Sequence, residues 1–142
     1  MTLSELKKYI DNFLHLSTDE WAAFSSLFTE LHLPKDSFFA KEGRHETKIG
    51  FLTNGIVRAF YRSDDGTEYN KTFFEPFEFI GAYTSLTTGQ QNQINIQALT
   101  DVNLFVADYS NIVALFDKHQ KIERLGRLIA EHFFADKEKR EI

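Results

Sequence analysis

The hydrophobic pattern changes its period twice along the chain, and this constrains the fold more than any other feature of the sequence. Between Ser37 and Val106, apolar and polar side chains alternate in short runs that glycine or small polar residues separate. Many short strands at this spacing favour a sandwich or a jelly roll, because doubling the sheet protects its edges. With 142 residues, the chain can bury one sizeable core. We therefore predict a single domain of the α+β class, mainly β, with a double-sheet jelly roll over residues 35–109.

Two features of this region predict how strands are connected and which side chains point inward. Asp65 and Gly66 lie between two alternating runs. This pair favours a hairpin, because glycine tolerates positive φ and aspartate bonds locally. Residues 93–106 indicate two further strands. Asn92 has the same parity as Ile94 and the apolar positions after it, so we expect it to face inward at the mouth of the strand.

Helical periodicity flanks the jelly roll on both sides. Residues 1–34 indicate a helical pair, in which Ser17 and Glu20 form a capping box and Pro34 ends the second helix. Residues 110–142 indicate a short helix and then a long one, whose broad apolar stripe consists of Ile122, Leu125, Ile129 and Phe133. A stripe of this width can contact the domain's own sheet and also a second helix. We expect these four residues to form a homodimer interface; the alternative is an ordinary terminal helix packed on its own domain.

Composition excludes several classes of protein. The net charge of −5 disfavours nucleic-acid binding by this chain alone, and the absence of cysteine excludes disulfides and thiolate metal sites. No signal-peptide pattern and no apolar run of membrane-spanning length occurs. We therefore expect a cytoplasmic protein that does not enter a membrane.

Residues 79–99 contain no Asp, Glu, Lys or Arg, although 26% of the chain is charged. The stretch instead offers neutral hydrogen-bonding groups, on Tyr83, Thr84, Ser85, Asn92 and Gln93. Three interpretations stay open: a cavity for a neutral or weakly polar ligand, a degenerate site that binds nothing, or a surface connection whose Thr, Gly and Asn residues satisfy local turns.

The order of helices, about eight strands and two helices resembles the cyclic-nucleotide-binding domain of the catabolite-activator (cyclic-AMP receptor, CRP/FNR) family of bacterial transcription regulators. The resemblance covers nearly the whole chain. It rests on "LPKDSFFAKEG" ending at Gly43, on "FLTNGIVRAFYRSDDGTE" with Gly55 and Gly66, and on "FEFIGAYTSL" with Gly81. It implies that residues 79–99 form the phosphate-binding cassette.

In members that bind cyclic nucleotides, this cassette presents a Glu to the ribose hydroxyl and an Arg to the cyclic phosphate. The resemblance places Ala82 and Asn92 at these two positions. A neutral amide can donate to an oxygen but cannot neutralise it. The ligand-binding residues that the resemblance implies are Gly81, Ala82, Tyr83, Thr84, Ser85, Asn92, Gln93 and Ile94. We expect a cyclic nucleotide or another small-molecule effector there, with high-affinity binding of cyclic AMP disfavoured, and no other cofactor.

The resemblance implies an allosteric effector domain and no enzyme. A ligand would bind two arrangements of the last helix unequally and thereby shift the dimer between them. In the family a helix-turn-helix follows this helix, but none is visible before the chain stops at "KEKREI". We expect DNA contact only through such a domain, in a longer regulator.

The main alternative is a cupin-like, metal-dependent small-molecule enzyme or binding protein, because cupins are also jelly rolls. "EGRHETKIG" offers His45 and Glu46 but lacks a second histidine two residues on, which makes a weak metal site. Arg58 and Arg62 share one strand face, and we expect a solvated patch that the acidic residues of "DDG" can pair. No metal is therefore expected.

Overall fold

The computed structural model describes residues 2–141, and the side chains of all of these except 70 and 139–141. The chain divides into two compact units, where we expected one domain. One unit runs from Thr29 to Tyr109, and the other combines the segment up to Phe28 with the segment from Ser110 onward. Two terminal residues of the predicted helical ranges lie outside the described residues: Met1 of 1–34 and Ile142 of 110–142.

Helices from both ends of the chain form the first unit. They are α1 (Ser4–Asp11), α2 (Thr18–Ser25), α4 (Tyr109–Ala114) and α5 (Gln120–Glu141). The capping box at the start of α2 is confirmed: the Glu20 amide donates to Ser17 Oγ at 3.2 Å, and the Ser17 amide donates to Glu20 Oε1 at 2.7 Å. Lys121 Nζ donates to the His15 carbonyl at 3.2 Å, which joins the two ends of the chain.

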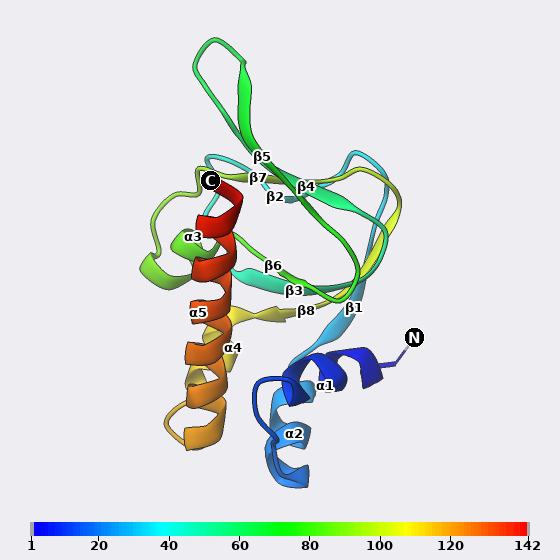
Figure 1. The fold of residues 1–142 in the computed structure, drawn as a ribbon, viewed down its shortest axis with the longest axis vertical. Helices are drawn as coiled ribbons and strands as arrows, with labels where there is room; N and C mark the ends of the chain where they lie inside the picture. The colour runs from blue at the N-terminus through cyan, green and yellow to red at the C-terminus, as the bar shows by residue number, and fades with distance from the viewer. Residues whose placement is uncertain (1, 142) are drawn as a thin grey trace. The chain divides into compact units, whose positions relative to one another are not determined.

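The β unit consists of two four-stranded antiparallel sheets, which Figure 1 shows in two layers. The first sheet has the order β1-β8-β3-β6, from Thr29–Leu33, Val102–Asp108, Lys48–Asn54 and Phe79–Ile80. The second has the order β2-β7-β4-β5, from Phe38–Ala40, Asn95–Ala98, Val57–Arg62 and Glu68–Phe74. The predicted fold class, mainly β with a double-sheet jelly roll, is confirmed.

The prediction that the second helix extends to Pro34 is wrong. Helix α2 ends at Ser25, and residues 29–33 form strand β1. This segment pairs with β8 from Thr29 opposite Val106 to Leu33 opposite Val102. Pairing with a strand about seventy residues away overrides the helical spacing of its leucines. The β unit therefore begins at Thr29, not at residue 35.

The two sheets enclose one apolar cluster, which includes Leu52, Val57, Ile80, Ile96 and Leu104. Burial of this kind is worth about 25 cal/mol per Å² of apolar surface and is the main favourable contribution to folding. Ala82 belongs to the same cluster, and Ile94 packs against it. Two of the predicted ligand-binding residues therefore also serve the core.

The hairpin predicted at Asp65 and Gly66 joins β4 to β5 and extends beyond the rest of the two sheets (Figure 1). Gly66 has a φ of +87°, and the Ser63 amide donates to the Thr67 carbonyl at 2.9 Å. Asp65 accepts hydrogen bonds from Ser63 and Thr67, which lower its pKa to about 2. Local bonding of the aspartate thus fixes the turn, as the sequence indicates.

Helix α5 begins at Gln120, as predicted, but three residues of its apolar stripe are interior. Ile122, Leu125 and Ile129 are 0%, 1% and 8% exposed in the single chain, and Phe133 is partly buried. Residues this deeply covered have almost no surface to offer a partner, so the structure does not favour these three as dimer contacts. Among the helices of residues 2–141, none has the combined length and apolar character that a bilayer span requires.

Candidate functional site

The neutral stretch folds into a short helix between two strands. After β6, Gly81 and Ala82 lead into α3 (Tyr83–Thr88), and Gly89 ends this helix with a φ of +73°. We did not predict α3, because its six residues carry no apolar period. Thr84 is exposed, and its carbonyl accepts a hydrogen bond from Thr88 Oγ1 at 2.6 Å.

Ser85 is the buried polar residue of α3, and its hydroxyl is already used. Its Oγ donates to the Gln90 carbonyl at 2.7 Å and accepts from the Glu46 amide at 3.1 Å. These bonds connect the helix to its following loop and to the segment before β3. Ser85 therefore holds the cassette in place, and its hydroxyl is engaged with the backbone.

Asn92 is buried, as its parity predicts, and its amide closes a loop. Its Nδ2 donates to the carbonyls of Lys41 at 2.9 Å and Ile94 at 2.7 Å, while its Oδ1 accepts from the Ile94 amide at 2.9 Å. Both donors of the side chain are thus occupied by backbone. Gln93, the next residue, is exposed and has no hydrogen bond with the residues that the structure describes.

Tyr83 contacts Tyr109, which lies at the end of the β unit. Their rings meet edge to face with centroids 5.9 Å apart, and the two hydroxyls are 3.4 Å apart. Partial burial, and then the bond to Tyr83, raise the pKa of Tyr109 well above its usual value. This phenol therefore stays protonated throughout the neutral range.

A pocket of about 310 Å³ lies at the base of the β4–β5 hairpin. We call it the hairpin pocket; its lining residues are Glu42, Gly43, Tyr61, Arg62, Tyr69, Asn92 and Gln93. Of the predicted ligand-binding residues, it contains Asn92 and Gln93 and none of the α3 residues. Sequence reasoning missed Tyr61 and Tyr69, although their near-symmetric placement about the Asp65–Gly66 turn would have indicated a cross-strand pair.

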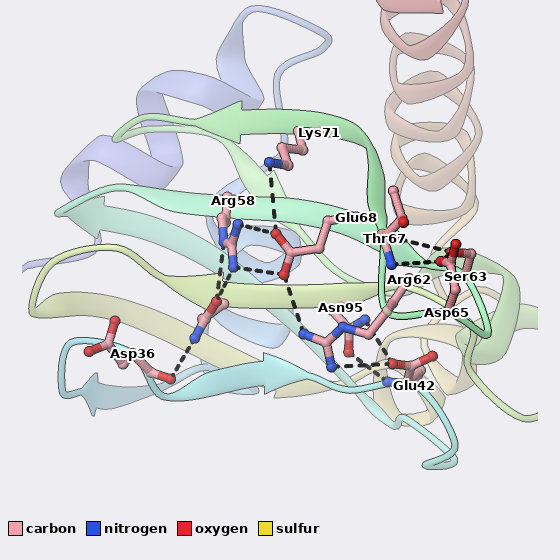
Figure 2. Close-up of polar contacts among 11 residues, drawn as sticks. Asp36, Glu42, Arg58, Arg62, Ser63, Asp65, Thr67, Glu68, Lys71 and Asn95 are labelled. Carbon is pink, nitrogen blue, oxygen red and sulfur yellow. Dashed lines mark hydrogen bonds and ion pairs between the residues drawn. The ribbon is translucent and has the colours of Figure 1, made fainter.

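A charged network covers the outer face of the second sheet, as Figure 2 shows. Arg58 donates to Glu68 at 2.8 Å and to Gln97 at 2.8 Å. Arg62 contacts Glu68 at 3.3 Å. Both guanidiniums also lie over the buried Phe60 ring, at 4.1 Å and 5.5 Å from its centroid.

The predicted partners of these arginines were wrong in one respect. Asp65 of "DDG" bonds to its own turn, and Glu68 pairs with the arginines instead. Antiparallel register explains this, because Arg62 lies directly opposite Glu68. The hydrogen bond from Arg58, with smaller contributions from Arg62 and Lys71, lowers the pKa of Glu68.

Changing Glu68 to glutamine should flatten the acid limb of the stability profile. The lowered folded-state pKa means that the carboxylate stabilises the fold above the unfolded value of about 4.3. That stabilisation is lost as pH falls through the folded-state pKa. Urea unfolding midpoints measured between about pH 2 and 6 should therefore fall less with acid in Glu68→Gln than in the wild type. Asp64→Asn, an exposed change in the same hairpin, should keep the wild-type slope.

The residues proposed for a cupin-like metal site are engaged elsewhere. His45 Nδ1 lies 3.1 Å from the Gly89 carbonyl, and Glu46 Oε1 accepts from the Lys41 amide at 2.9 Å. Within the part of the chain that the structure describes, no three His, Cys, Asp or Glu side chains are grouped to hold a metal ion. The alternative function is not favoured.

Comparison with known proteins gives a family and several structural neighbours. The family model described as "Cyclic nucleotide-binding domain" matches residues 30–119. No curated protein matches the sequence. The Thermus thermophilus catabolite activator protein is 20% identical with a TM-score of 0.72, covering 89% of this chain and 60% of that chain. This chain therefore spans about 60% of the length of that neighbour.

Two shorter solved structures are similar over almost the whole chain. A cyclic nucleotide-binding domain from Methylobacillus flagellatus is 14% identical with a TM-score of 0.81, covering 97% of this chain and 81% of that chain. The sensor domain of the transcriptional regulator DNR from Pseudomonas aeruginosa is 13% identical with a TM-score of 0.76, covering 99% and 92%. At these identities the likeness establishes the fold.

Proposed function

Because the chain belongs to the cyclic nucleotide-binding domain family, we propose that it is a non-catalytic effector domain that senses a small molecule other than cyclic AMP. The main support for this proposal is the hydrogen bonding of the Asn92 side chain. Where nucleotide-binding relatives would offer a guanidinium, this chain has an amide whose two donors bond to backbone carbonyls. Ala82 offers no carboxylate to a ribose hydroxyl.

The energetic consequence is large for a charged ligand. A hydrogen bond to a charged group is worth about 1.5–3 kcal/mol, and each 1.4 kcal/mol is about tenfold in affinity. Without either charged partner, a cyclic nucleotide loses about two to four decades of affinity relative to a site that has both. A ligand without a phosphate loses nothing through the missing guanidinium.

Thermal unfolding with cyclic AMP tests the proposal. A ligand with a Kd of about 10 µM, present at about 1 mM, would stabilise the native state by about 2.7 kcal/mol through mass action. We expect no shift of the unfolding temperature beyond that caused by about 1 mM AMP, the ring-opened control. A shift of several degrees that is specific to cyclic AMP would contradict the proposal.

We further propose that α5 forms a homodimer through its exposed side, with Phe134 at the contact. Phe134 is 74% exposed, which is unusual for so large an apolar side chain. A small molecule that binds two arrangements of this helix unequally would shift the dimer between them. Contact with DNA would need a separate module, since the net charge of −5 disfavours direct binding by this chain.

The variant Phe134→Glu tests the dimer contact without changing a buried residue. The wild type should be a dimer by light scattering, and Phe134→Glu should be a folded monomer with a similar unfolding temperature. Leu125→Glu, at a 1% exposed position, should instead unfold the helical unit. A wild-type monomer, or a Phe134→Glu dimer of wild-type affinity, would exclude this contact.

A further inference from the structure

The hairpin pocket has an aromatic wall formed by Tyr61 and Tyr69. Tyr61 and Tyr69 lie opposite each other on β4 and β5, with ring centroids 5.7 Å apart and planes 24° from parallel. Such a pair stabilises a hairpin, but Tyr69 remains 45% exposed. Its uncovered surface is a platform on which another planar ring can stack.

The charges of the pocket are balanced before any ligand enters. Among its lining residues, Arg62 is the cation, and Glu42, at 3.8 Å, is the anion that pairs with it. Glu68, at 3.3 Å from Arg62, lies outside the lining and is shared with Arg58 and Lys71. An entering anion would meet a guanidinium that is already paired, and the Glu42 carboxylate in the lining would repel it. The pocket therefore disfavours phosphates and accepts molecules without net charge.

Glu42 nevertheless keeps capacity to accept hydrogen bonds. Its Oε1 lies 3.4 Å from Asn95 Nδ2 and 3.8 Å from Arg62, both longer than strong charge-assisted bonds. Figure 2 shows Glu42 beside these two side chains, with dashed lines to both. A carboxylate offers about four acceptor positions, so ring or exocyclic N–H groups of a ligand can bond to it.

The amide of Gln93, another lining residue, can both donate and accept. It is exposed and makes no hydrogen bond with residues 2–141 whose side chains are described. Asn92 forms a fixed wall beside it, because its own amide is bound to Lys41 and Ile94. The pocket thus combines a stacking surface, a carboxylate with further acceptor positions and an exposed amide around a volume of about 310 Å³, at the lower end of the usual range for ligand sites.

We propose that the hairpin pocket binds a small planar aromatic molecule without net charge, stacked on Tyr69 and donating N–H groups to Glu42. The Gln93 amide hydrogen-bonds to a second polar group of the ligand. This inference rests on the proposed sensing function and names the place and the chemical class of the ligand.

Chemical-shift titration of the full chain tests the inference with four probes: adenosine, cytosine, nicotinamide and L-tryptophan. At least one should cause saturable shifts of backbone amides in Glu42–Gly43 and in the β4–β5 hairpin. Tyr69→Leu should weaken that binding by about tenfold, as expected for the loss of ring stacking. Phe73→Leu changes a second exposed aromatic position on the same strand, one that does not line the pocket, and should leave the binding unchanged. AMP should bind at least about tenfold more weakly than adenosine if adenosine is the ligand that binds.

The inference is overturned if none of the four probes gives saturable shifts at millimolar concentration, or if Tyr69→Leu binds as the wild type does. Shifts confined to α3 would also overturn it, but would leave the sensing function standing. Specific stabilisation by cyclic AMP would instead defeat the proposed function, so the two failures are distinguishable.

Discussion

Changing Asn92 to aspartate should lower the free energy of unfolding by about 3–5 kcal/mol, although the two side chains have nearly the same shape. The amide nitrogen donates to two carbonyls, at 2.9 Å and 2.7 Å. In aspartate a charged oxygen would take its place and face both carbonyl oxygens. The carbonyls of Lys41 and Ile94 would lose their donor, and the carboxylate would be buried at this position without a paired cation.

Urea denaturation at neutral pH measures this effect. Gln93→Asp is the matched control, because it makes the same change of charge one residue away, at an exposed side chain. It should alter the stability by less than about 0.5 kcal/mol. Equal effects at the two positions would show that Asn92 does not hold the loop, and would remove the main support for the proposed function.

Gly55→Ala should cost at least about 3 kcal/mol of stability, the second large effect. Gly55 has a φ of +94°, and an added Cβ would lie 2.5 Å from the Asp101 carbonyl oxygen. Both the backbone strain and the clash with backbone must then be relieved by moving the chain between β7 and β8.

The variant Gly66→Ala measures the cost of backbone strain without a steric clash. Gly66 has a similar φ of +87°, but nothing lies within 4 Å of its added Cβ. This variant should lose only about 1 kcal/mol, from the left-handed conformation alone. If both variants lose the same stability in urea denaturation, the close approach of Asp101 does not contribute.

Local chemistry made the hairpin, the capping box and the start of α5 predictable. Asp65 and Ser17 each act through neighbours within a few residues, so the sequence pattern carries the information. The start of α5 follows from the apolar spacing of the residues after Gln120. Strand β1 was missed because its partner β8 lies about seventy residues away. The apolar stripe of α5 predicted which residues are buried, but its periodicity could not show whether the same chain or a second copy covers them.

The site was predictable in position and not in detail. The absence of charge in residues 79–99 pointed to the cassette, and Asn92 is buried there as its parity indicated. Its bond to Lys41 joins two segments about fifty residues apart, which no local pattern reveals. The hairpin pocket was missed for the same reason, because it assembles Glu42, Tyr61 and Gln93 from three separate segments.

The side-chain amide of Asn92 offers the most direct measurement of the central claim, that the cassette is closed on itself and does not hold cyclic AMP. In ¹H–¹⁵N spectra, its two Nδ2 protons should exchange slowly with solvent, because the side chain is buried and both protons are bonded to backbone carbonyls. They should stay in place when cyclic AMP is added to about 1 mM. Rapid exchange of these protons, or a saturable shift at micromolar cyclic AMP, would contradict the account.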